Sequence, residues 1–143
     1  MKHEKTAQTE DSIDAAMKVM QAHIDGINAR DGTAIAATLH FPHFRLTDGQ
    51  LKTWNTSDSY LSDFRSRAGQ DWSHSAWGHL NVIHQDDNKV HLDVEVVRYG
   101  EDGSLLIAFP SLWVVAKIDG IWAAQLRSSF APDADIIAER TFK

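Results

Sequence analysis

Two histidines flank a Phe-Pro step in the segment "LHFPHFRL", residues 39–46. Histidine binds zinc and also transfers protons near neutral pH, so His40 and His43 are candidates for both kinds of chemistry. A zinc pair on a helix has i, i+4 spacing, and zinc fingers place about three to five residues between their histidines. Here two residues intervene, one of them Pro42, and no third ligand is near in the sequence. The spacing favours a structural corner, and no metal is predicted.

Three residues are candidates for catalysis by proton transfer. His43 is expected at the mouth of a pocket, just after the Phe-Pro turn. His23 lies on the flank of an apolar helical stripe, between Met20 and Ile27, where it faces either a pocket or solvent. Asp48 lies in "TDGQ", which is typical of a turn, and a general base is the alternative interpretation. The candidate catalytic residues are therefore His23, His43 and Asp48.

Aromatic side chains supply candidates for ligand contact. The chain has five tryptophans among 143 residues. Most aromatic side chains in a protein of this size belong to the core, but an enclosed flat organic ligand also needs such walls. The candidates for binding a small hydrophobic molecule are Trp54, Tyr60, Phe64 and Trp113.

Helical periodicity fills the first half of the chain. The first helix is predicted to begin at Ser12 and to end near Arg30. A short second helix follows a cap at Thr33 and includes Leu39. A third helix is predicted in "TSDSYLSDFRSRAG", with Thr56 or Ser57 as its cap and Gly69 at its end.

After Trp72 the hydrophobic pattern changes to a period of two, which predicts strands. Turn sequences separate four strand candidates, at residues 75–85, 89–99, 104–118 and 121–130. A shorter strand pair is predicted at 44–46 and 51–54.

The dipeptide Asp119-Gly120 predicts a type I′ hairpin and thereby a register. Ile118 should pair with Ile121, and continuing the register pairs Val115 with Ala124 and Trp113 with Leu126. Alternation then places Trp113, Val115, Trp122, Ala124 and Leu126 on the concave face with Val90–Val96. Asp93, Glu95 and Arg127 fall on the outer face, as a solvated surface or a dimer interface.

This order of elements predicts an α+β fold in which three N-terminal helices pack on a long, strongly curved antiparallel sheet. We expect a flexible tail at 1–10, a single domain at 11–132 and a C-terminal extension at 133–143.

Several segments, in their order and spacing, resemble the SnoaL-like group of the nuclear transport factor 2-like superfamily. They are "INARDG", "LHFPHFRL", "DGQLKTW" and "SLWVVAKIDGIWAAQLRSSFAP", and the resemblance covers roughly Asp11–Pro132. It implies a cone-shaped, cystatin-like α+β barrel with an internal pocket, and a homodimer formed through the outer sheet face. The superfamily includes ketosteroid isomerases, scytalone dehydratase, polyketide cyclases and non-catalytic domains, so the fold does not name the function.

The resemblance also implies positions for a ketosteroid isomerase site. The tyrosine that binds the oxyanion corresponds to His23, the general-base aspartate lies close to Thr47 or Asp48, and the second oxyanion acid lies near Trp113. Tryptophan cannot replace that acid. The implied function is an internal apolar pocket for a small hydrophobic molecule, with cofactor-independent isomerase, lyase or cyclase chemistry. The alternative is a non-catalytic ligand-binding or dimerisation module.

Composition excludes several other classes. The net charge is -6, and the basic residues are scattered, so no nucleic-acid partner is expected. The absence of cysteine excludes disulfides and thiol nucleophiles. No phosphate loop or dinucleotide fingerprint is present, so no cofactor is predicted. The lack of a signal peptide or a long apolar run predicts a cytoplasmic protein without a membrane partner.

Overall fold

The computed structural model describes residues 2–68 and 71–131. The predicted extension at 133–143 and the predicted helix end at Gly69 lie outside these residues. The elements, in chain order, are α1 (Lys2–Ala29), α2 (Gly32–Ala36), β1 (Leu39–Thr47), β2 (Gln50–Trp54), α3 (Ser57–Ala68), β3 (His74–Gln85), β4 (Lys89–Tyr99), β5 (Leu105–Ile118) and β6 (Ile121–Ser129).

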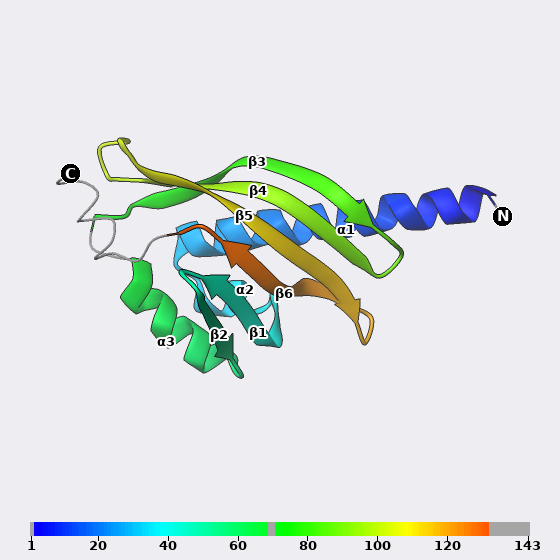
Figure 1. Cartoon of the computed structure of the whole chain (residues 1–143), viewed down its shortest axis with the longest axis horizontal. Coiled ribbons are helices and arrows are strands. Elements are labelled where there is room, and N and C mark those ends of the chain that lie inside the picture. Colours follow the sequence, from blue (N-terminus) through cyan, green and yellow to red (C-terminus); the bar gives the residue numbers. More distant parts are fainter. Residues whose placement is uncertain (1, 69–70, 132–143) are drawn as a thin grey trace.

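The strands form one six-stranded sheet in the order β2-β1-β6-β5-β4-β3. Figure 1 shows the curved sheet with α1 along one face and with α2 and α3 beside β1 and β2. All neighbouring strands are antiparallel except β1 and β6, which are parallel. The predicted α+β fold is therefore confirmed, and one parallel pair corrects the antiparallel expectation.

Three helix boundaries differ from the prediction. Helix α1 begins at Lys2, so the start predicted at Ser12 is wrong. Asp31 rather than Thr33 caps α2, because its extended backbone lets its carboxylate accept from Ala34 N at 3.1 Å. Leu39 begins β1, where it pairs with Ala124, and is not helical.

The predicted α3 cap and the predicted hairpins are confirmed. Thr56 Oγ1 accepts a hydrogen bond from Ser59 N at 3.2 Å. Asp119 and Gly120 have φ of 53° and 79°, and the pairs Ile118–Ile121 and Val115–Ala124 form as predicted. Two successive positive φ angles are what a type I′ turn requires, which explains the Asp-Gly sequence.

A β-bulge in β6 changes the register beyond Ala124. Val115 pairs with Ala124 but Val114 pairs with Leu126, so Gln125 is the extra residue. Trp113 consequently pairs with Arg127, and the predicted Trp113–Leu126 pair is wrong. A bulge of this kind redirects the side chains that follow it.

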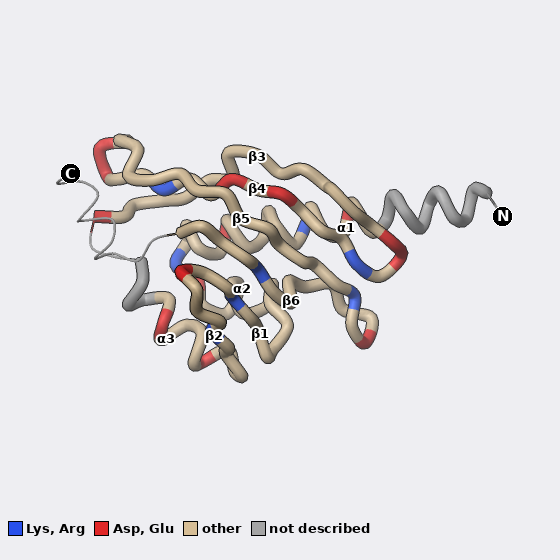
Figure 2. Tube along the Cα trace, in the orientation of Figure 1, with Lys and Arg blue, Asp and Glu red and all other residues tan. Residues whose placement is uncertain are grey.

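The bulge reverses the predicted faces of two residues in β6. Arg127, predicted on the outer face, is buried with 6% of its surface exposed, and Leu126, predicted on the concave face, is 36% exposed. Strand β1 has the same arrangement, because Arg45 is 8% exposed and Leu46 is 46% exposed. Arg45 and Arg127 are direct partners across the parallel β1–β6 pair, and Figure 2 shows the basic segments of these strands side by side. An arginine therefore faces inward from each strand.

The remaining concave face follows the predicted alternation. Val90, Leu92 and Val94 of β4 are fully buried in the core. Asp93 and Glu95 occupy alternate positions of the same strand and lie half-buried on the outer face, as predicted. His79 Nε2 lies 3.6 Å from Asp93 Oδ2 on this face.

Side-chain hydrogen bonds fasten α1 to β3. Asn28 Nδ2 donates to Ser75 O at 2.8 Å, and Asn28 Oδ1 accepts from Ser75 N at 2.7 Å. At an earlier position of α1, the carbonyl oxygen of Met20 accepts a hydrogen bond from Trp77 Nε1 at 2.9 Å. These bonds fix the part of α1 that carries His23 against the sheet.

Candidate functional site

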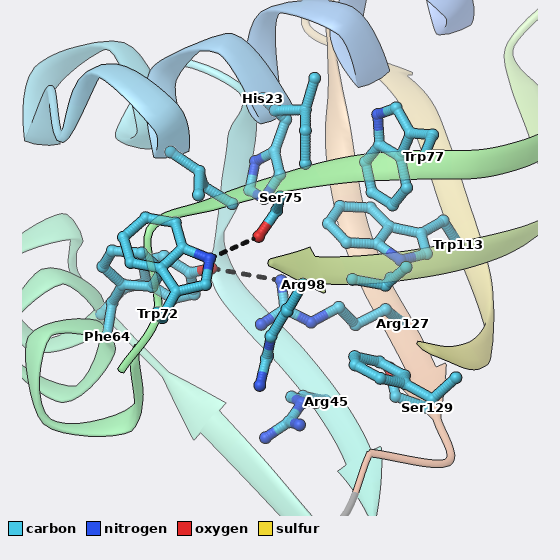
Figure 3. Close-up of a pocket in the computed structure, with 15 residues that line it drawn as sticks. His23, Arg45, Phe64, Trp72, Ser75, Trp77, Arg98, Trp113, Arg127 and Ser129 are labelled. Carbon is cyan, nitrogen blue, oxygen red and sulfur yellow. Dashed lines mark hydrogen bonds between the residues drawn. The ribbon is translucent and has the colours of Figure 1, made fainter. Parts of the chain in front are cut away.

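A cavity of about 60 Å³ lies between α1, α3 and the concave face of the sheet. By the usual measure of roughly 10–15 Å³ per water, this volume holds about four waters or a small organic molecule. Figure 3 shows the lining side chains. Six of them are aromatic: Tyr60, Phe64, Trp72, Trp77, Phe109 and Trp113.

His23 lines the cavity from α1, with only 1% of its surface exposed. Its Nδ1 lies 2.8 Å from Thr38 Oγ1, and Thr38 Oγ1 donates to Ile35 O at 2.6 Å. The Thr38 hydroxyl has only one hydrogen, which it donates to the Ile35 carbonyl. Its oxygen therefore accepts a hydrogen bond from His23 Nδ1. The hydrogen bonds therefore place a proton on His23 Nδ1.

Two tryptophans hold the His23 ring. The Trp113 ring meets it edge to face at 4.9 Å, and the Trp77 ring is nearly parallel to it at 6.5 Å. Both tryptophans also line the cavity. The histidine thus has a fixed orientation in a mainly apolar part of the cavity.

Arginines form another part of the lining. Arg45, Arg98 and Arg127 come from β1, β4 and β6, and Figure 3 shows them grouped on the side away from α1. Arg127 donates to Tyr60 Oη at 3.2 Å, and its guanidinium carbon lies 5.0 Å from the Trp113 ring centre. No acidic residue is among the described residues that line the cavity. Three strands therefore each contribute an arginine to this side of the cavity.

Trp113 contributes a further polar group. It is 3% exposed, and its Nε1 has no hydrogen-bond partner among residues 2–68 and 71–131. By contrast, Trp72 Nε1 donates to Ser75 Oγ at 2.8 Å. The indole N–H of Trp113 is a donor that cannot accept, so it suits a ligand oxygen.

Of the side chains predicted to contact a ligand, three line the cavity and one does not. Tyr60, Phe64 and Trp113 are lining residues. Trp54 is buried beside the cavity, where its ring lies 5.1 Å from Tyr60 and its Nε1 donates to Asp63 Oδ2 at 3.2 Å. Its predicted place in the lining is wrong, because it packs behind Tyr60.

His43 is not at a pocket mouth, so that predicted position is wrong. It is fully buried beside Trp54 and Tyr60, outside the cavity lining, and its Nδ1 donates to Ala124 O at 3.1 Å. His40 instead donates from Nε2 to Ala116 O at 2.8 Å. The two histidines therefore bind backbone carbonyls of different strands.

The Phe-Pro step between these histidines lies inside β1, with a cis Phe41-Pro42 peptide bond. The pairing is irregular here, since β1 passes from Leu39 to Phe44 while β6 passes only from Ala124 to Leu126. The segment was expected to lead the chain off α2, and it instead forms an irregular stretch of the strand.

Asp48 lies in the β1–β2 turn, away from the cavity lining. It is exposed and has a φ of 51°, and Gly49 follows with a φ of 73°. Its position matches the turn interpretation.

Three arginines of the lining were not predicted. Arg98 had a usable signal, because the alternation from Val90 to Val96 continues to it. Arg45 and Arg127 had no such signal. Hydrophobicity favours the neighbouring leucine on the inward face and the arginine on the outward face, and the structure shows the reverse.

The described residues show neither a metal cluster nor a membrane helix. Within them, no three His, Asp or Glu side chains are placed to hold a metal ion. None of their helices is long and apolar enough to cross a membrane.

Comparisons with known proteins identify the fold only. No protein-family model and no curated protein matches the sequence. Among solved structures, a protein of unknown function with a cystatin-like fold from Nostoc punctiforme has a TM-score of 0.68 at 11% identity, covering 82% of this chain and 89% of that one. An NTF2-like protein from Cytophaga hutchinsonii has a TM-score of 0.65 at 17% identity, covering 83% and 97%.

A third similar structure carries a functional description. It is a ketosteroid isomerase-like protein from Erwinia carotovora, with a TM-score of 0.56 at 15% identity, covering 82% of this chain and 95% of that one. At these identities the likeness concerns the arrangement of the backbone and no activity. The chain has the cystatin-like fold of NTF2-like proteins.

Proposed function

We propose that the cavity binds a small organic molecule and that His23 transfers a proton to or from it, as a cofactor-independent isomerase, lyase or cyclase would. The observation that carries this proposal is the placement of His23, which is buried in the cavity lining and oriented by its hydrogen bond to Thr38. A general acid or base needs a fixed direction, and the Nδ1–H bond to Thr38 and the packing of the ring against Trp113 hold His23 in one orientation.

The surroundings of His23 support proton transfer. When Nε2 takes a proton, the Nδ1–H bond to Thr38 Oγ1 persists and stabilises the imidazolium. Trp77 and Trp113 limit the access of water to the ring, which strengthens electrostatic interactions inside the cavity.

The residue set differs from the one implied for a ketosteroid isomerase. Asp48 lies in an exposed turn, and Trp113 stands near the position of the second acid. The proposed reaction therefore differs from one that uses these two acids.

Deuterium exchange into small carbonyl compounds tests the role of His23. A panel of acetone, cyclohexanone and 2-cyclohexenone is incubated with the protein in D2O, and loss of the α-proton signal is followed by NMR. We expect at least one compound to exchange faster with the protein, and His23→Asn to slow that exchange by about 100-fold or more. Asparagine retains an N–H near Nδ1 for Thr38 and removes Nε2.

His40→Asn is the matched control, because His40 is half-buried and bonds to Ala116 O outside the cavity. It should exchange protons at the wild-type rate. If no compound exchanges faster with wild type than with His23→Asn, proton transfer is refuted and ligand binding without catalysis takes its place.

A second candidate function is self-association through the outer sheet face. Leu46 and Leu51 are paired across β1 and β2 and are 46% and 65% exposed, and Leu126 on neighbouring β6 is 36% exposed. The β-bulge turns Leu126 outward, so these three leucines share the outer face. Adjacent exposed apolar side chains are typical of an interaction surface.

Light scattering tests the dimer. We expect wild type to be a dimer and the double variant Leu46→Lys/Leu126→Lys to be a monomer. Ile83→Lys, at a 47% exposed position on the opposite edge strand β3, should remain dimeric. A monomeric wild type, or a dimer that tolerates the double variant, would rule out this surface.

A further inference from the structure

The indole N–H of Trp113 differs from those of the other tryptophans around the site. Trp54, Trp72 and Trp77 each donate their N–H to an acceptor of the chain, at 2.8 to 3.2 Å. The Trp113 side chain is 3% exposed, and its Nε1 has no acceptor within the described part of the chain. A buried donor without an acceptor is costly in free energy, so this N–H calls for an explanation.

No acceptor for this N–H is found among the described groups packed around the Trp113 ring. Arg127 lies over the ring, with its guanidinium carbon 5.0 Å from the ring centre, and a guanidinium has donors only. His23 and Trp77 meet the ring edge to face at 4.9 and 5.4 Å. Trp113 itself is part of the cavity lining. The acceptor therefore belongs to what occupies the cavity.

A carbonyl oxygen suits this donor better than a hydroxyl or an amine does. It accepts hydrogen bonds and donates none, so it adds no further donor to a part of the cavity formed by the rings of His23, Trp77 and Trp113. The volume of about 60 Å³ limits the compound to a few carbon atoms.

His23 and Trp113 are adjacent in the cavity lining, although they come from α1 and β5. Their ring centres are 4.9 Å apart, and Figure 3 shows both among the lining side chains. A compound that accepts the Trp113 N–H therefore has its next carbon atoms beside His23. A carbonyl group acidifies the C–H bonds of the neighbouring carbon, which is the position that a proton-transfer residue must reach.

We infer that Trp113 Nε1 donates a hydrogen bond to the carbonyl oxygen of a small enolisable ketone, and that this bond strengthens as the neighbouring carbon loses a proton. The inference rests on the proposed function, in which His23 takes that proton. As the C–H bond breaks, its electron pair forms the C=C bond of the enolate and negative charge collects on the carbonyl oxygen. A donor already positioned at this oxygen stabilises the charge.

Paired titrations with butanone and its alkene analogue test the hydrogen bond. The analogue has a methylene group in place of the carbonyl oxygen, so the two compounds have nearly the same shape and only butanone accepts a hydrogen bond. Binding to wild type and to Trp113→Phe is followed by NMR. We expect the affinity for butanone, relative to that for the alkene, to fall by about threefold to tenfold in Trp113→Phe.

Trp77→Phe is the matched control for this ratio. Trp77 also lines the cavity and contacts the Trp113 ring, but its Nε1 already donates to Met20 O. Its replacement should change the binding of both compounds by the same factor. A measurement on wild type covers the case in which Trp113→Phe does not fold. The Trp113 indole N–H signal should move downfield with butanone and not with the alkene.

Deuterium exchange into butanone tests the strengthening of the bond. At saturating butanone, we expect Trp113→Phe to exchange the α-protons about tenfold to a hundredfold more slowly than wild type. The loss appears at saturation because the bond is stronger to an enolate oxygen than to a ketone oxygen. Trp122 packs against the core outside the cavity lining, so Trp122→Phe should exchange at the wild-type rate.

Two results would overturn the hydrogen bond. One is an equal response of the Trp113 N–H signal to butanone and to the alkene, which would make bound water its acceptor. The other is an unchanged affinity ratio in Trp113→Phe. Exchange that depends on His23 and not on Trp113 would contradict this inference and leave the proposed function standing. A ketone bound through Trp113 without exchange would contradict the proton transfer alone, and failure to bind either compound would contradict both.

Discussion

Replacing Trp113 with alanine is expected to lower the free energy of unfolding by about 3–5 kcal/mol. The side chain is 3% exposed and belongs to the core cluster. Its ring contacts His23 at 4.9 Å and Trp77 at 5.4 Å, and Arg127 lies over it at 5.0 Å. These three contacts come from α1, β3 and β6, so alanine would remove packing against three elements at once. Urea unfolding followed by circular dichroism measures the loss.

Trp113→Phe separates the packing of this residue from its hydrogen bonding. Phenylalanine keeps an aromatic ring against His23 and removes the indole N–H, so we expect a clearly smaller loss of stability. If the alanine and phenylalanine variants unfold at the same urea concentration, an aromatic ring at this position contributes little to the free energy of unfolding.

Replacing Asn28 with alanine is the second large expected effect, a loss of about 2–4 kcal/mol. The side chain makes both a donor and an acceptor bond to the backbone of Ser75, at 2.8 and 2.7 Å. Alanine leaves Ser75 N and O, which are part-buried, without these partners. Because α1 is then less firmly attached to β3, the position of His23 relative to the cavity should also become less fixed. Amide hydrogen exchange at Ser75, together with urea unfolding, measures the effect.

Asn28→Asp and Asn81→Ala are the controls for this bond pair. Aspartate keeps an oxygen that accepts from Ser75 N and loses the donor to Ser75 O, so an intermediate loss is expected. Asn81 is an exposed residue of β3, and its replacement should change stability by less than about 0.5 kcal/mol. An Asn28→Ala protein as stable as Asn81→Ala would show that the two bonds do not attach α1 to the sheet.

Local signals predicted the second half of the chain well. Strand β4 and the β5–β6 hairpin have alternating apolar residues and an Asp-Gly turn, and their bounds lie within about two residues of the prediction. These signals act over neighbouring residues and over one hairpin, so they can be read without knowledge of the tertiary structure. The start of α1 was missed because residues 2–11 have no apolar stripe.

The bulge at Gln125 had no comparable signal. It is an event of one residue, in a strand that pairs with β5 on one side and with β1 on the other. The Asp-Gly turn sets the register at one end of β6 only, and that register ends at Ala124. The inward direction of Arg127 therefore could not be predicted from hairpin chemistry.

The candidate site was predicted in part for the same reason. His23 lies in a regular helix, where spacing alone places it next to the core, and the structure shows it in the cavity lining. His43 lies in the irregular stretch of β1, and Trp54 pairs with it from β2. The directions of both side chains depend on strand pairing, which the sequence does not show. The reversal of Arg45 and Leu46 contradicts hydrophobicity itself, and only the tertiary structure shows it.

The extra residue in β6 also affects how related chains must be aligned. If a related chain lacks Gln125, its strand is regular: Ala124 faces inward, Leu126 outward and Arg127 inward. Such a chain would still present an arginine to the cavity. In a chain of equal length without the bulge, the leucine would face the cavity instead. A related chain that aligns with a gap opposite Gln125 therefore keeps an inward arginine. For a chain that aligns without a gap, the alignment does not say whether an arginine or a leucine faces the cavity.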